Sequence, residues 1–213
     1  MNDLTLWKQI APRLRGGEIF FFDGAPGFLD DAIQFVTHSK LTHAAMVLDP
    51  KLPIQGKSQA RVNLIESTIL TDAAGQQVDG PQINDAEWRI TTYDKGGRIW
   101  VCLLDDRVRA LLDFAKMWAL AFGKIGKDRY NKIELLEYVV RDIPLVNDLP
   151  VLYDADSHRE VCSEFCCDVL QAGGLPGLLP FQMPPQKLAE LKIYSECVQI
   201  VGRELTISGF NTV

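Results

Sequence analysis

Residues 18–24 read Glu18-Ile19-Phe20-Phe21-Phe22-Asp23-Gly24. Four consecutive apolar residues between an acidic residue and a turn-forming pair predict a short, buried β-strand. Before this stretch, apolar residues at helical spacing predict a helix over residues 4–14, which Gly16-Gly17 would end. The chain therefore begins with a helix that leads into a buried strand.

The rest of the chain continues with strands first and helices later. Further strands are predicted at 42–48, 62–68, 98–104 and 197–205. Helices are predicted at 28–36, between the capping pair Asp105-Asp106 and Gly123, at 131–141, at 160–171 and at 185–191. Because strands and helices segregate along the chain, we expect one α+β domain over residues 1–213, with a mostly antiparallel sheet packed against helices.

Two details of this prediction bear on packing. The Gly-, Asp- and Gln-rich residues 72–85 are interpreted as an excursion over the surface. The helix between Asp105 and Gly123 is expected to turn toward the core the residues Val108, Leu111, Leu112, Ala115, Trp118, Ala119 and Phe122.

Composition narrows the classes of function. The 213 residues carry a net charge of −6 and a pI near 5.1, which argues against binding to nucleic acid or to an anionic membrane surface. No stretch approaches the roughly 18 apolar residues of a membrane-spanning helix, and residues 1–8 lack the pattern of a secretory signal. Five cysteines without a Cys-x-x-Cys pair favour free thiols in the cytoplasm. Delivery to the periplasm or to another cell by a signal-independent route is the alternative.

Cys162 is the candidate nucleophile. The helix predicted after it places Cys162 in the first turn, where free N–H groups and the helix dipole stabilise a thiolate. The same N–H groups could hold the oxyanion of a tetrahedral intermediate. A buried structural thiol is the alternative for Cys162, and the deeper Cys166 and Cys167 are interpreted as packing residues.

His43 is the candidate base, and Glu66 is the candidate third member. Both lie on predicted strands, and a buried Glu66 needs a partner such as the His43 imidazole, whose tautomer it would fix. A core histidine and an exposed strand-end carboxylate are the structural alternatives. His158, four residues before Cys162, is the rival base, whereas His38 lies in a loop-like context.

Other polar residues give weaker signals. The hydroxyl of Tyr130 could line a substrate cleft, although a tyrosine that packs at the start of a helix fits as well. His158, Cys162 and Cys166 recur every four residues and could share a helical face as metal ligands, but zinc commonly takes four ligands from two paired motifs. We expect neither a metal nor a cofactor, since no glycine pair matches a phosphate-binding loop.

Four motifs together resemble one known family. They are Gly17-Glu18-Ile19-Phe20-Phe21-Phe22, Thr42-His43-Ala44-Ala45-Met46-Val47, Ile65-Glu66-Ser67 and Cys162-Ser163-Glu164. In this order they are similar to the circularly permuted, NlpC-type papain-like cysteine amidases (YiiX/YaeF-like), which are related to the lecithin-retinol acyltransferase group. Glu18 replaces the usual aspartate. The resemblance implies a permuted papain-like fold with Cys162 as nucleophile, His43 as base and Glu66 as third polar member.

Three functions remain open from the sequence. The favoured one is hydrolysis of an amide through a thioester, with a peptidoglycan stem peptide as first candidate substrate, as in a lytic or effector protein that a cognate inhibitor or immunity protein would restrain. The second is acyl transfer, or lipid ester or thioester hydrolysis, by the same residues. The third is a binding module without turnover.

Overall fold

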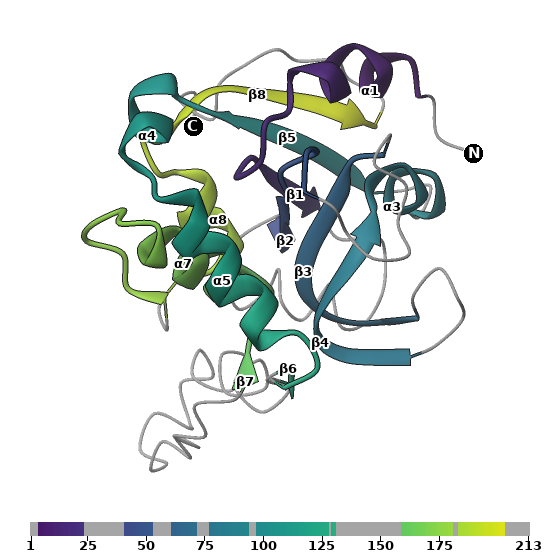
Figure 1. The fold of residues 1–213 in the computed structure, drawn as a ribbon. Coiled ribbons are helices and arrows are strands. Elements are labelled where there is room, and N and C mark those ends of the chain that lie inside the picture. Colours follow the sequence, from purple (N-terminus) through teal and green to yellow (C-terminus); the bar gives the residue numbers. More distant parts are fainter. Residues whose placement is uncertain are drawn as a thin grey trace, which may run out of the picture.

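The computed structural model describes residues 4–23, 41–52, 61–71, 77–93, 97–127, 129–130, 159–180 and 183–202 (Figure 1). Within these ranges, a six-stranded sheet has the order β4-β3-β2-β1-β5-β8, and all of its neighbouring strands are antiparallel. Its strands are β1 (Ile19–Asp23), β2 (Leu41–Val47), β3 (Asn63–Thr71), β4 (Gln77–Asp85), β5 (Arg98–Leu104) and β8 (Tyr194–Val201). The α+β class and the mostly antiparallel sheet are confirmed.

Helices flank the sheet on both faces. They are α1 (Thr5–Ile10) with a 3₁₀ turn η1 (Ala11–Arg13), α3 (Ala86–Thr92), α4 (Asp106–Leu111), α5 (Phe114–Lys124), α7 (Cys162–Ala172) and α8 (Pro185–Ala189). Two short strands, β6 (Arg129–Tyr130) and β7 (Arg159–Glu160), pair in parallel as a separate two-stranded sheet, and β6 lies beside β3 and β4. None of these helices has the length and apolar character to cross a bilayer. The helices predicted at 28–36 and 131–141 fall outside the described ranges.

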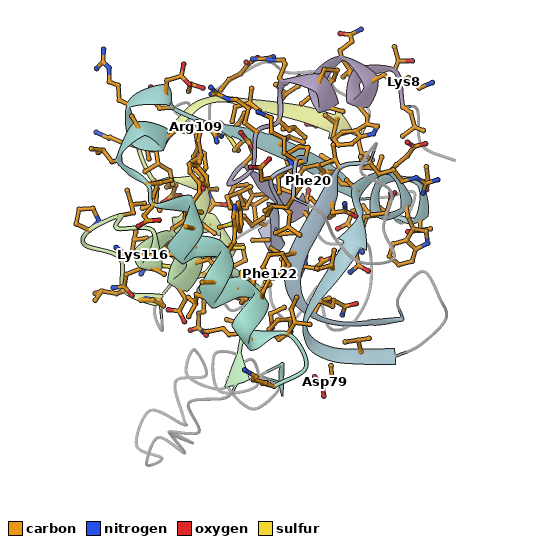
Figure 2. The ribbon with its side chains drawn as sticks, viewed as in Figure 1. Lys8, Phe20, Asp79, Arg109, Lys116 and Phe122 are labelled. Carbon is orange, nitrogen blue, oxygen red and sulfur yellow. A yellow bond between two sulfur atoms is a disulfide. The ribbon has the colours of Figure 1, made fainter. Side chains whose placement is uncertain are left out.

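Strand β1 contributes core residues to both faces of the sheet. Ile19 and Phe21 pack in a cluster with α5, α7 and α8, whereas Phe20 and Phe22 pack in a second cluster with α1 and α3. All four side chains are fully buried, and Figure 2 shows Phe20 in the interior of the molecule. Because successive strand residues point to opposite faces, a strand covered on both sides needs an unbroken apolar run.

Residues 77–85 correct the interpretation of 72–85 as a surface excursion. They form β4, which pairs with β3 from Asn63↔Asp85 to Thr71↔Gln77. Gln82 and Asn84 are buried in this strand and form hydrogen bonds there. These polar residues make the segment resemble a loop, although their side chains form hydrogen bonds in the interior.

The single helix predicted between Asp105 and Gly123 is also wrong. Two helices, α4 and α5, replace it, because the Asp113 side chain caps α5 by accepting from the Lys116 N–H (3.1 Å). Leu111 is 72% exposed, Phe122 is 38% exposed, and Ala115 and Ala119 are exposed as well, so the inner stripe does not continue through both helices. Leu112 and Trp118 are buried as expected.

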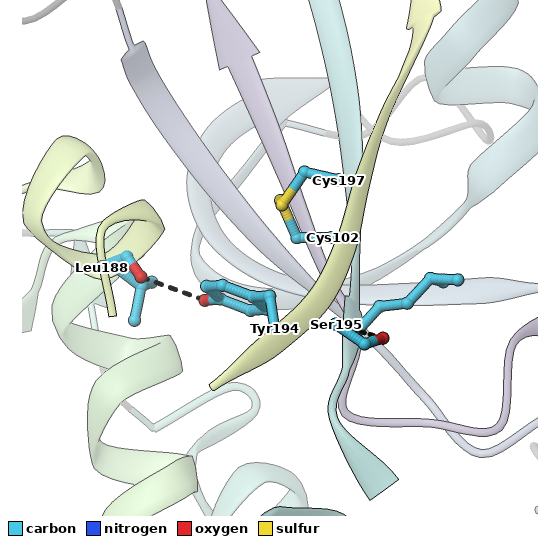
Figure 3. Close-up of a disulfide and its surroundings, with 6 residues drawn as sticks. Cys102, Leu188, Tyr194, Ser195 and Cys197 are labelled. Carbon is cyan, nitrogen blue, oxygen red and sulfur yellow. Dashed lines mark hydrogen bonds between the residues drawn. A yellow bond between two sulfur atoms is a disulfide. The ribbon is translucent and has the colours of Figure 1, made fainter. Parts of the chain in front are cut away.

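A disulfide links Cys102 on β5 to Cys197 on β8, so the expectation of free thiols is wrong for this pair (Figure 3). The two residues lie directly opposite each other in the β5–β8 register. Nearby, the Tyr194 hydroxyl donates a hydrogen bond to the Leu188 carbonyl (3.1 Å), which ties β8 to α8. Cys162, Cys166 and Cys167 are free thiols.

Candidate active site

Cys162 is the first residue of α7, as its predicted place in the first turn requires. Val161 precedes it in an extended conformation, and the Val161 N–H donates to the Glu164 carboxylate (3.3 Å), which fixes the start of the helix. The N–H groups of this first turn have no partner within the helix and carry the positive end of its dipole. The Cys162 sulfur therefore lies where a negative charge is stabilised.

His43 lies on β2 beside an irregularity in the sheet. Phe22 pairs with His43 and Asp23 pairs with Leu41, so the intervening Thr42 has no counterpart on β1. Such bulges bend a strand and redirect its side chains. The imidazole packs against the Phe22 ring, with 5.3 Å between the ring centroids, and this contact fixes its plane.

The imidazole joins the other two predicted site residues. Its Nε2 lies 2.6 Å from the Glu66 Oε2, and it forms a side-chain hydrogen bond with the Cys162 thiol. Because Nε2 faces Glu66, the nitrogen that remains for the sulfur is Nδ1. Cys162, His43 and Glu66, which are far apart in the sequence, are thus brought together.

Glu66 has no exposed surface, and four donor atoms surround its carboxylate. Besides His43, Asn84 Nδ2 donates to Oε1 (2.8 Å), Arg89 Nη2 donates to Oε2 (3.1 Å), and Arg89 Nε lies 2.9 Å from Oε1. The alternative of an exposed strand-end charge is therefore wrong.

Asn84 and Arg89 were missed in the sequence. Asn84 falls in the segment that was interpreted as a surface excursion. Arg89 lies on a stripe with Ala86 and Ile90, which are buried at helical spacing. A cation on an apolar helical stripe signals a buried acidic partner, but the sequence does not reveal which one.

Electrostatics couple the thiol and the imidazole. Burial raises the pKa of Cys162, but the charge and hydrogen bond of His43 and the backbone N–H groups of Ala44 and Ser163 lower it below its ordinary value. Burial likewise disfavours a charged His43, yet Cys162 and then Glu66 raise its pKa to about 9. The lowered pKa of the thiol and the raised pKa of the imidazole both favour a thiolate beside an imidazolium.

The carboxylate completes this arrangement. Burial raises the pKa of Glu66, but the positive charge of Arg89, followed by the hydrogen bond and charge of His43 and the Asn84 amide, lowers it to about 2. Glu66 is therefore ionised throughout the physiological range and holds the Nε2 proton of His43.

The two deeper cysteines of α7 behave differently. Cys166 and Cys167 are fully buried in the core cluster beside α5 and α8, which confirms that they pack. Burial raises the pKa of Cys166 well above its usual value and that of Cys167 to about 12. Of the three free thiols, Cys162 is the one with a lowered pKa.

The remaining candidates stay untested. His38 and His158 lie outside the described residues. The backbone of Tyr130 lies in β6, paired with Glu160 of β7, but its side chain is not among those described. In the described part of the chain, no group of three His, Cys, Asp or Glu side chains is placed to bind a metal, and the alternative metal set that includes His158 is not tested.

Comparison with known proteins adds no assignment: no family model matches the chain, and no curated protein is significantly similar to it.

Proposed function

We propose that this chain is a cysteine hydrolase that cleaves an amide bond through a thioester on Cys162. The observation that supports this most directly is the continuous hydrogen-bonded row of thiol, imidazole and carboxylate formed by Cys162, His43 and Glu66. A nucleophile beside a base, which a third group orients, is the arrangement that covalent hydrolysis requires.

The chemistry follows from the protonation states. The Cys162 thiolate attacks the carbonyl carbon, a C–S bond forms, and the N–H groups at the start of α7 stabilise the oxyanion. The imidazolium of His43 gives its proton to the leaving nitrogen as the C–N bond breaks. The neutral imidazole then takes a proton from water, the resulting hydroxide attacks the thioester, and the released thiolate restores the ion pair.

We infer a circularly permuted papain-like, NlpC-type fold as the finer architecture. The order of His43 on β2, Glu66 on β3 and Cys162 on α7 supports this inference, together with the four motifs that resemble that family. The resemblance also supplies the first substrate to test, the stem peptide of peptidoglycan.

The test is digestion of purified peptidoglycan by the purified protein. We expect the wild-type protein to release soluble muropeptides and Cys162→Ala to release none. Cys167→Ala is the matched control, because it removes another buried thiol of α7 that lies outside the row, and it should keep activity. Activity in Cys162→Ala would refute the mechanism. Turnover of short acyl thioesters without peptide cleavage would support the acyltransferase or lipid hydrolase alternative.

A further inference from the structure

Arg89 is a buried residue that adjoins the proposed site. Its side chain is 9% exposed, and its guanidinium contacts both oxygens of the fully buried Glu66 carboxylate. This two-pronged contact combines one hydrogen bond, from Nη2 to Oε2, with an ion-pair contact between Nε and Oε1 that lacks hydrogen-bond geometry. A positive charge held against both oxygens stabilises the ionised carboxylate.

The Phe22 ring contacts both the Arg89 guanidinium and the His43 imidazole. The Arg89 Cζ lies 4.8 Å from the centre of the Phe22 ring, and the same ring packs against His43 at 5.3 Å. One aromatic side chain of β1 therefore braces both positively charged neighbours of Glu66.

The charges along this row alternate. A Cys162 thiolate, a His43 imidazolium, the Glu66 carboxylate and the Arg89 guanidinium sum to zero. A buried charge is costly unless it is paired and hydrogen-bonded. Without Arg89 the row would keep a net negative charge inside the protein, which protonation of Glu66 or Cys162 would relieve.

We propose that Arg89 is a positioning residue that keeps Glu66 ionised and aimed at His43, so that the imidazolium–thiolate pair persists. This role rests on the proposed function, because it concerns the same site. Arg89 acts through Glu66 and touches neither the sulfur nor the reacting atoms in this mechanism.

The surroundings of Glu66 support the proposal. The groups that face it are His43 from β2, Asn84 from β4 and Arg89 from α3, while Cys162 and Cys166 of α7 lie beyond. Asn84 is neutral, so Arg89 is the fixed positive charge among them. Arg89 also heads the interactions that hold the pKa of Glu66 near 2 against burial.

The test is the pH dependence of Cys162 alkylation by iodoacetamide, followed by mass spectrometry. This rate reports the thiolate fraction and needs no substrate. The midpoint is the pH at which the alkylation rate reaches half of its maximum. In Arg89→Met, the loss of a nearby positive charge should raise this midpoint by about one pH unit or more. The alkylation rate at the wild-type midpoint would then fall about fivefold. Arg89→Lys keeps the charge but loses the two-pronged contact, so we expect about a twofold fall.

Arg109→Met is the matched control. Arg109 forms an ion pair with the buried Glu18 at the other end of β1, so its loss should lower stability and leave the alkylation midpoint unchanged. An unchanged midpoint in folded Arg89→Met, or an equal shift in Arg109→Met, would overturn the proposal. If Arg89→Met does not fold, as near-ultraviolet circular dichroism would reveal, an unchanged midpoint in Arg89→Lys decides against it.

The outcome separates the two proposals. A shifted midpoint in Arg89→Met without any amide hydrolysis would refute the proposed function and support the role of Arg89. Hydrolysis that depends on Cys162, with an unchanged midpoint in Arg89→Met, would support the proposed function and refute the role of Arg89.

Discussion

Cys162 and Cys167 lie on one helix and differ in their electrostatic surroundings. The pKa of Cys162 is lowered, chiefly by His43 against the effect of burial, whereas burial raises that of Cys167 to about 12. Because the thiolate is the reactive form, we expect iodoacetamide to alkylate Cys162 at least about 100-fold faster than Cys167 at neutral pH. Peptide mass spectrometry of the native protein measures both rates. Equal rates would contradict a thiolate at Cys162.

The imidazolium of His43 should persist to alkaline pH. Its pKa is raised to about 9, so the charged form is complete at neutral pH and is lost as the pH rises through 9. We therefore expect the ring signals of His43 in NMR to titrate near pH 9, and hydrolysis to fall above that pH as the leaving nitrogen loses its proton donor.

Glu66→Gln tests the source of this shift. Removing the carboxylate charge beside the imidazole should lower the His43 pKa by about one unit, and the alkaline fall of activity should move with it. Assignment of the His43 signals by comparison with His43→Gln keeps the measurement specific. An unaltered titration in Glu66→Gln would mean that Glu66 does not stabilise the imidazolium.

At the scale of elements, the cap of α3 links stability to the site. The Asp85 side chain accepts from the Trp88 N–H (2.8 Å) and so fixes the start of the helix that carries Arg89. Asp85→Ala should cost about 1 kcal/mol of unfolding free energy in urea and should also slow Cys162 alkylation.

Asp105→Ala is the counterpart of that variant. Asp105 caps α4 through the Arg107 N–H (2.8 Å), and α4 carries none of the site residues. We expect a similar loss of stability with unchanged alkylation. Equal slowing in both variants would show that α3 has no special link to the thiolate.

Local pattern was sufficient for most of the strands and for the start of α7. The Phe20–Phe22 run predicts β1 because a strand covered on both faces must be apolar throughout. Strand β4 was missed because Gln82 and Asn84 are polar residues that hydrogen-bond in the interior, which a one-dimensional pattern cannot distinguish from solvent exposure. The division between α4 and α5 was missed because apolar spacing continues past Asp113.

The site could be predicted only in part. Cys162, His43 and Glu66 could be selected from the sequence because their residue types suit the roles of nucleophile, base and orienting carboxylate. Arg89 binds Glu66 across 23 positions of sequence, and that contact exists only because α3 packs on the sheet. The sequence alone therefore does not indicate that Arg89 and Glu66 lie close together.

At the scale of the whole molecule, the Cys102–Cys197 disulfide closes a loop with a sequence separation of 95 residues and holds the edge strand β8. Cross-links across long loops restrict the unfolded chain most. We expect reductant to lower the free energy of unfolding in urea by about 2–4 kcal/mol. The Cys102→Ala/Cys197→Ala variant should be insensitive to reductant, and identical wild-type curves with and without it would contradict the cross-link.

The site also depends on both faces of the sheet. Helix α7 packs in the cluster of one face and supplies Cys162, whereas α3 packs in the cluster of the other and supplies Arg89. The strands between them supply His43 and Glu66. Correct chemistry therefore requires the assembled layers, and a loss of packing on either face should affect the thiolate.

The central claim is that Cys162 is a thiolate paired with the His43 imidazolium. Its most direct test is the ultraviolet absorbance of the thiolate as a function of pH, taken as the difference between the wild-type protein and Cys162→Ala. The account predicts a midpoint below the value of about 8.5 for a free cysteine. A midpoint at or above that value would contradict it.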